Sequence, residues 1–194
     1  MALRLPVEAD RAEYIALRRR SRAFLEPWDS TPPGTRRGWN YAAAAFDRAL
    51  ATSRLESSLR LLIRRPEDDA VMGAVGISNI VRGAFQSCTI GYWIGIEFSR
   101  QGYMTDALAL TLHTCFRTLG LHRVEANIMP SNLASTALVV RLGFVEEGLA
   151  RRYLRINGRW RDHVRWGMTI EDYRGLCRRG VIPFGRTRRL PVML

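Results

Sequence analysis

The chain has 194 residues, of which 47% are hydrophobic and 25% are charged, and its formal net charge is +12. This composition is typical of one globular domain with a substantial core, and it excludes disordered and fibrous chains. The sequence contains no apolar run of membrane-spanning length, and charged residues occur throughout positions 1–11, where a secretory signal needs an apolar core.

The cysteines and the surplus of arginine limit the compartment and the partners. Cys88, Cys115 and Cys177 lack the spacing of metal ligands, so we expect reduced, mostly buried cysteines in a cytoplasmic protein without a metal site. The sequence contains no lysine, so its 30 basic residues are all arginines. Such a positive surface needs anionic partners, which include phosphate-bearing ligands, ribosomes and RNA.

Hydrophobic periodicity and turn residues predict a strand, two helices and three strands in the first half of the chain. The expected elements are a strand at residues 3–6, a helix at 10–22, a proline-rich loop at 24–34, a helix capped by Thr35, and strands at 59–64, 71–80 and 87–96. The last strand leads into a turn at Gly102, after which the apolar positions follow a helical period from Met104 to Leu119.

The second half predicts a strand at 123–129, a helix at 132–142, and two strands at 145–156 and 160–168 around Asn157-Gly158. Asn-Gly between two apolar strands is a strong signal for a two-residue hairpin turn. We expect this hairpin to have one buried face, formed by Leu154, Ile156, Trp160, Val164 and Trp166. The element order indicates a mixed α/β domain at residues 1–170, followed by a basic tail at 171–194.

The stretch from Tyr92 to Thr105 combines a strand, a tight turn and the start of a helix. Gly102 lies where the backbone must bend sharply or approach a ligand closely. The first turn of a helix offers unpaired N–H groups and the positive end of the helix dipole. The pattern therefore predicts a phosphate-binding site at this turn.

This turn resembles motif A of the GNAT acetyltransferases, in which a Gln/Arg-x-x-Gly-x-Gly/Ala loop holds the pyrophosphate of acetyl-CoA. The aligned residues run from Ser99 to Met104, and both of these end residues depart from the family pattern. A second resemblance covers more of the chain. Residues 24–28, 121–135, 141–148 and 157–163 are similar to ribosomal-protein-alanine N-acetyltransferases of the RimJ/RimL type, and to the RimJ group in particular.

The resemblance implies the GNAT fold, an α/β (α+β) arrangement with a mixed sheet of about six to seven strands and about four flanking helices. It also implies acetyl-CoA as co-substrate. The backbone at Trp93 and Ile94 would pair with the pantetheine arm, and Asn132 would hydrogen-bond to it, although Asn132 is equally suited to cap the following helix. The pyrophosphate would be held by the backbone of Arg100, Gln101, Gly102, Tyr103, Met104 and Thr105.

Acetyl transfer needs a base for the attacking amine and an acid for the departing sulfur. The resemblance makes Ser135 the candidate acid, because Val139 stands where many GNATs place a tyrosine; a plain buried serine is the alternative. Glu125 is the candidate base, because it alternates with apolar residues on its strand, and an ion pair with Arg123 or another arginine is the alternative. His163 or a water chain is the fallback.

The leading hypothesis is an N-acetyltransferase that moves the acetyl group of acetyl-CoA directly to the N-terminal α-amine of a protein. Ribosomal proteins are the expected substrates, and no membrane partner is expected. The alternatives are an acetyltransferase for a small amine and a non-catalytic CoA-binding module associated with ribosomes or RNA. An acidic pocket would favour a polycationic acceptor, an open groove would favour a peptide, and turnover would exclude the module.

Overall fold

The structure is a computed structural model that describes residues 1–31 and 41–182. The strands are β1 (Ala2–Arg4), β2 (Arg54–Leu55), β3 (Ser58–Arg64), β4 (Val71–Val81), β5 (Ser87–Ile94), β6 (Arg123–Ile128), β7 (Val145–Ile156) and β8 (Arg159–Thr169). The α-helices are α1 (Arg11–Arg20), α2 (Arg22–Leu25), α3 (Tyr41–Ala51), α4 (Tyr103–His113), α5 (Leu133–Arg141) and α6 (Ile170–Arg178). The shorter helical turns are η1 (Glu8–Asp10), η2 (Glu26–Trp28), η3 (Ile96–Phe98) and the π-helical η4 (Thr114–Thr118).

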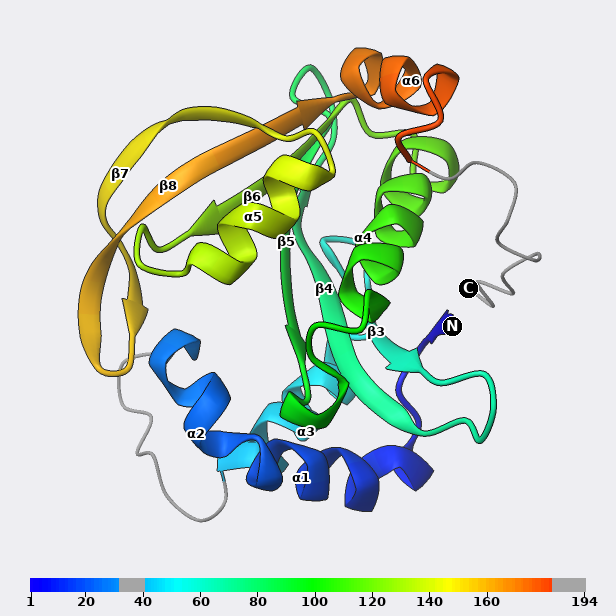
Figure 1. Cartoon of the computed structure of the whole chain (residues 1–194), viewed down its shortest axis with the longest axis vertical. Helices are drawn as coiled ribbons and strands as arrows, with labels where there is room; N and C mark the ends of the chain where they lie inside the picture. The colour runs from blue at the N-terminus through cyan, green and yellow to red at the C-terminus, as the bar shows by residue number, and fades with distance from the viewer. Residues whose placement is uncertain (32–40, 183–194) are drawn as a thin grey trace.

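The strands form a single mixed sheet in the order β1-β3-β4-β5-β6-β8-β7, and the short β2 pairs with β3 (Figure 1). Only β5 and β6 run parallel among the described pairs, since the others are antiparallel. The predicted mixed sheet is thus confirmed, with seven strands in its main path. The described helices exceed the expected number because α2 and α6 add to the layers.

Helices cover both faces of this sheet. Cys88 of β5 lies against the α4 side, with its Sγ 3.8 Å from Cys115 Sγ in η4. Trp93 lies on the opposite face, since side chains alternate along a strand, and its ring contacts Tyr14 of α1 at 5.3 Å. Tyr14 in turn packs against Phe46 of α3 at 5.2 Å. We call these two sides the α4 face and the α1 face.

The parallel pair β5 and β6 separates before either strand ends. Pairing begins at Ser87 and Arg123 and stops at Ile90 and Ala126. β5 nevertheless continues to Ile94 and remains paired there with β4. We call the point beyond Ile90 and Ala126 the fork, because the two strand edges diverge there and no described strand lies between them.

The chain after the fork is organised by caps and turns that the sequence predicted. Asn132 caps α5 by accepting a hydrogen bond from the Ser135 backbone at 3.2 Å. Gly143, with φ of +88°, ends this helix. Asn157 and Gly158 have φ of +46° and +77°, which confirms the hairpin turn.

The predicted buried face of the hairpin is wrong. The two-residue turn pairs Ile156 with Arg159, so Trp160 points to the opposite face from Ile156. Trp160 is 58% exposed and Leu154 is 39% exposed, whereas Ile156 and Trp166 are buried. An irregularity in β7 between Ala150 and Leu154 further shifts the register, which single-residue counting does not reveal.

Two other expectations differ at their boundaries. The loop expected at 24–34 is helical through Trp28, as α2 and η2. The Thr35 cap lies outside the described residues. The described part of the predicted tail forms α6, whose Tyr173 and Leu176 are buried in the core beside the sheet. In the described ranges, no helix combines the length and apolarity needed to cross a membrane.

Candidate active site

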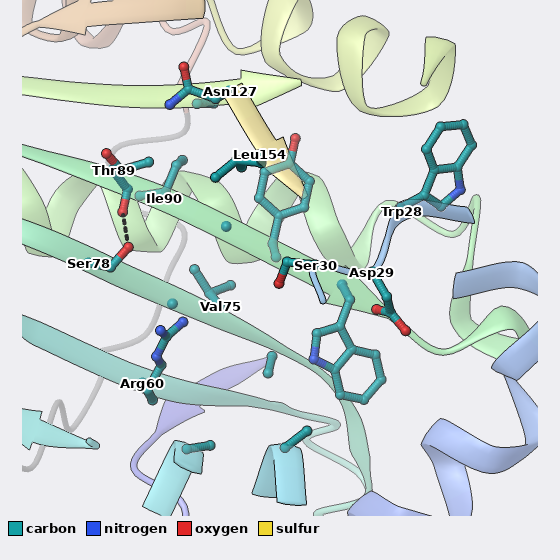
Figure 2. Close-up of a pocket in the computed structure, with 18 of the residues that line it drawn as sticks. Trp28, Asp29, Ser30, Arg60, Val75, Ser78, Thr89, Ile90, Asn127 and Leu154 are labelled. Carbon is teal, nitrogen blue, oxygen red and sulfur yellow. Dashed lines mark hydrogen bonds between the residues drawn. The ribbon is translucent and has the colours of Figure 1, made fainter. Parts of the chain in front are cut away.

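A cleft of about 620 Å³ opens at the fork and joins the two faces of the sheet. Tyr92, Asn132 and Ser135 line it on the α4 face, while Trp93 and Asn127 line it on the α1 face. A ligand on one face can therefore meet a ligand on the other through the gap between β5 and β6. We call the part on the α1 face the acceptor cleft (Figure 2).

The segment after η2 forms one wall of the acceptor cleft by docking on the hairpin. Thr31 donates its backbone N–H to the carbonyl of Arg155 at 2.9 Å, and Asn157 donates to the carbonyl of Asp29 at 3.1 Å. Ser30 forms an isolated β-bridge with Ile156. These bonds bring residues more than a hundred positions apart into one wall, which no local pattern could predict.

Arg18 fixes this wall to α1. Its Nη2 contacts both carboxylate oxygens of Asp29 at 2.9 Å, and its guanidinium lies 4.7 Å from the centre of the Trp93 ring. The pair is largely buried, so each charge depends on the other. Arg18 is thus occupied by a structural partner within the cleft.

The predicted phosphate turn, residues 99–105, has the geometry of an anion-binding backbone loop. We call it the cofactor turn. Gly102 has φ of +86° and Arg100 has φ of +59°, a rare conformation for a residue with a side chain. The first helical hydrogen bond is donated by Asp106 to the Gly102 carbonyl at 3.1 Å. The N–H groups between these residues thus precede the first helical hydrogen bond and can donate hydrogen bonds to an anion.

Two side chains brace this turn against η3. Ser99 donates its hydroxyl to the Ile96 carbonyl at 2.8 Å, and Gln101 donates its amide to the Glu97 carbonyl at 2.8 Å. Ser99, which departs from the family pattern, therefore has a local structural role. The cofactor turn does not itself line the cleft, but only η3 separates it from the end of β5, whose Trp93 does.

Two buried polar side chains at the fork have no hydrogen-bond partner among the described residues. They are the hydroxyl of Tyr92 and the side-chain amide of Asn127, in which neither the nitrogen nor the oxygen has a partner. Burial raises the pKa of Tyr92 to about 12, while its neighbour Ser135 acts in the opposite direction. Buried polar groups without partners are costly, so this pair marks a place where a ligand can supply the missing bonds.

Comparison with known proteins agrees with this geometry. Residues 1–145 match the family described as "Acetyltransferase (GNAT) domain". The chain belongs to the GNAT acetyltransferases. This family uses acetyl-CoA as its acetyl donor, and the fork and cofactor turn are suited to hold such an elongated, phosphate-bearing molecule.

Specific relatives of this GNAT acetyltransferase include ribosomal-protein enzymes. It is 34% identical to the ribosomal protein uS5-alanine N-acetyltransferase of Escherichia coli over 84% of this chain and 82% of that protein. Its fold matches Mycobacterium smegmatis RimJ in complex with CoA-disulfide, with a TM-score of 0.81, 33% identity, and coverage of 92% and 88%. A ribosomal-protein-S5-alanine acetyltransferase from Vibrio fischeri matches with a TM-score of 0.76 and 28% identity, covering 88% and 93%.

In this GNAT acetyltransferase, the structure brings together some of the predicted site residues and not others. Trp93, Asn132 and Ser135 line the cleft, whereas Ile94 and residues 100–105 do not. Among the cleft-lining residues of the described chain, Asn127 is present and Glu125 is not.

Glu125 lies one step away from the fork, in a charged network. Its Oε1 accepts a hydrogen bond from Arg123 Nε at 3.0 Å, and Arg165 Nε lies 3.9 Å from its Oε2. Arg123 also pairs with Glu147, and these two carboxylates raise the pKa of Arg123. This arrangement supports the structural alternative for Glu125, and its role as base stays a prediction.

His163 is the second candidate base that the sequence analysis named. It lines the cleft, is only 3% exposed, and has Nδ1 3.0 Å from the Arg161 carbonyl oxygen. A carbonyl oxygen only accepts, so Nδ1 carries the hydrogen and Nε2 keeps its lone pair in the neutral ring. Burial lowers the pKa of His163, which favours this neutral form.

Proposed function

We propose that this GNAT acetyltransferase is a cytoplasmic enzyme that transfers the acetyl group of acetyl-CoA to the N-terminal α-amine of a protein, with ribosomal proteins as the substrate class. The observation that carries this proposal is the cleft that joins both faces of the sheet at the fork. A donor on one face and an extended acceptor on the other would meet there without an acetylated enzyme intermediate. The similarity to uS5-alanine N-acetyltransferase supports the choice of acceptor.

Acetyl-CoA supplies an activated thioester when it is bound, and the residues described here fit its parts. The N–H groups of residues 100–105 would hold the pyrophosphate, since Gly102 presents an open backbone with nothing within 4 Å of where a side chain would begin. Beyond the fork, no strand of the described chain pairs with the β5 backbone at Trp93 and Ile94 on the β6 side, and this backbone would pair with the pantetheine arm. Asn132 would contribute there while it caps α5.

The acid function is assigned to Ser135, with Tyr92 behind it. Ser135 lines the cleft near the start of α5, and Tyr92 is its buried neighbour on the same face. The Ser135 hydroxyl would donate its proton toward the leaving sulfur. The Tyr92 hydroxyl, which lacks a described partner, would orient that hydroxyl.

The base has two candidates, Glu125 and His163. Glu125 would act through water held by Asn127, whose amide lies at the fork without a described partner. His163 would act through Nε2 from within the cleft. The demand on either is light, because an α-amino group has a pKa of about 8.

Mass spectrometry of ribosomal-protein N-termini tests the function. Cells that contain the gene should carry an N-terminal acetyl group on at least one ribosomal protein that begins with alanine. Deletion of the gene should remove that group, and the wild-type gene should restore it while a Ser135→Ala copy does so poorly. Identical N-termini in all strains would contradict the proposed substrate class.

A further inference from the structure

Arg60 lies in the acceptor cleft, where a glycine on the neighbouring strand leaves space for its guanidinium. It is a β3 residue that pairs with Gly76 of β4, and it lines the cleft. A side chain at position 76 would begin 2.0 Å from Arg60 Nη1, so the guanidinium occupies the space above Gly76 that only glycine leaves free. Figure 2 shows Arg60 directed across the strands toward Val75 and Ser78.

The positive charge of Arg60 has no counter-charge within the described chain. No carboxylate of the described residues forms an ion pair with it, and Arg48, which also lines the cleft, adds charge of the same sign. Residues 32–40 and 183–194 contain no Asp or Glu. Burial, reinforced by Arg48, lowers the pKa of Arg60.

The two arginines that are buried among the described residues are paired. Arg18 shares the cleft with Arg60 but contacts both oxygens of Asp29. Arg64, four residues along β3, contacts Asp69 at 2.7 Å as well as Asp10 and Glu13. A partly buried guanidinium without such a partner is costly to keep, which points to an anion that arrives with a ligand.

The strand register connects Arg60 to the fork. Arg60 pairs with Gly76, Gly76 pairs with Gly91, and Gly91 is the first β5 residue beyond the last β5–β6 pair. The row between Arg60 and the fork therefore holds two glycines, and neither of them places a side chain on the α1 face. With strands about 4.8 Å apart, the guanidinium above Gly76 lies roughly 5 Å from the edge where the amine must react.

We propose that Arg60 forms an anion subsite in the acceptor cleft, which receives a carboxylate that the acceptor carries close to its reacting amine. This inference rests on the proposed function and names the acceptor class more closely. Because an extended peptide advances about 3.4 Å per residue, the carboxylate belongs to an acidic side chain at roughly the second or third position. A guanidinium binds a carboxylate through two parallel hydrogen bonds, which gives both affinity and orientation.

The same subsite disfavours cationic acceptors. Lys or Arg next to the reacting amine, or a polyamine, would place a second positive charge beside Arg60 and Arg48. In a cleft that screens charges less than water does, this repulsion lowers binding. The cleft is therefore basic, whereas a polycationic acceptor would need an acidic pocket.

The test compares three alanine-starting peptides that differ only at positions 2 and 3, which carry Glu, Gln or Lys. For the wild-type enzyme with acetyl-CoA, kcat/KM should be at least about tenfold higher for the Glu peptide than for the Gln peptide, mainly through KM, and lowest for the Lys peptide. Arg60→Gln should remove the preference for Glu over Gln. Arg174→Gln, which removes an exposed arginine from α6, should keep it.

Equal kcat/KM for the Glu and Gln peptides in the wild type would overturn the subsite. So would an Arg60→Gln variant that loses the same factor on both peptides while binding acetyl-CoA normally. If Arg60→Gln fails to fold, the wild-type series still decides, because the preference for Glu should weaken as salt is raised.

Two small amines separate this proposal from the proposed function. Free alanine carries a carboxylate beside its amine, and spermidine carries only positive charge. If alanine is acetylated in an Arg60-dependent way and no peptide is acetylated, the result supports the anion subsite and contradicts a protein acceptor. If spermidine is the preferred acceptor, the anion subsite is contradicted.

Discussion

The cofactor turn and the acceptor cleft are built from different materials. The turn uses the backbone of seven consecutive residues, and two side chains only brace it. The acceptor cleft uses side chains from α1, α3, six strands and the segment after η2. The turn is formed by one short segment, so local sequence can predict it. The cleft is formed by distant segments that come together only when the sheet has formed. Substitutions should therefore affect cofactor binding in the first region, and acceptor choice and catalysis in the second.

The largest effect is expected in the cofactor turn. Gly102→Val places a side chain where we propose that the backbone approaches the pyrophosphate, and φ of +86° is unfavourable for valine. We expect CoA to bind about 100-fold more weakly, or about 3 kcal/mol, in isothermal titration calorimetry.

Gly120→Val is the matched control. Gly120 has φ of +64° and equally open surroundings, but it lies beyond η4, away from the cofactor turn. It should show a similar loss of stability with normal CoA affinity. Equal affinity in both variants would remove the pyrophosphate from residues 100–105.

The next effect concerns the α4 face of the cleft. If Ser135 is the proposed acid, Ser135→Ala should lower kcat by about tenfold while the affinity for acetyl-CoA changes little, because the variant lacks the proton donor for the departing sulfur. Rapid-quench measurement of the chemical step tests this. A variant with wild-type kcat would return Ser135 to a structural role.

Tyr92→Phe separates stability from activity at the same place. The hydroxyl is buried and has no described partner, so its removal should leave stability unchanged or raise it by up to about 1 kcal/mol. The rate should nevertheless fall severalfold if the hydroxyl orients Ser135. Thermal unfolding and turnover are measured on one preparation, and a fall in stability without a fall in rate would contradict the assignment.

The identity of the base gives a smaller, pH-dependent effect. Glu125→Gln and His163→Gln are compared in pH–rate profiles with one peptide. The variant that lacks the base should be slow at neutral pH and partly recover as pH rises toward the amine pKa of about 8. Two profiles identical to the wild type would leave proton removal to water.

The smallest effect is on stability. Burial lowers the pKa of His163 in the folded protein, so below about pH 6.5 the unfolded chain binds more protons than the folded one. The stability contributed by the neutral ring is present above that pH and is lost as pH falls through the lowered folded value. His163→Gln should flatten the dependence of Tm on pH in this acidic range, and an unchanged slope would contradict it.

The predictable parts of this molecule follow the same division. Local sequence patterns predict strands such as β4 and the helical period of α4, and Gly102 indicates a turn. The fork cannot be read in this way, because it depends on where two strands, more than thirty residues apart, stop pairing. Tyr92 and Arg60 gain their importance only from that geometry.

The misjudged hairpin face has a related cause. Periodicity assigned Trp160 to the same side as Ile156, but the turn pairs Ile156 with Arg159 and reverses that assignment. The corrected register puts His163 on the cleft side, which is why this residue is buried. Glu125 was placed on the correct face by alternation, but the pattern could not show that Arg123 and Arg165 surround it.

The most direct test of the central claim locates the acetyl group that the purified chain transfers. A peptide that begins with alanine and also contains an internal lysine is incubated with isotope-labelled acetyl-CoA, and the product is sequenced by tandem mass spectrometry. An N-terminal acetyltransferase should place one label on the α-amine and none on the lysine, and it should give no product from a peptide whose N-terminus is blocked. Label on the lysine, or a blocked peptide that reacts equally well, would contradict that claim.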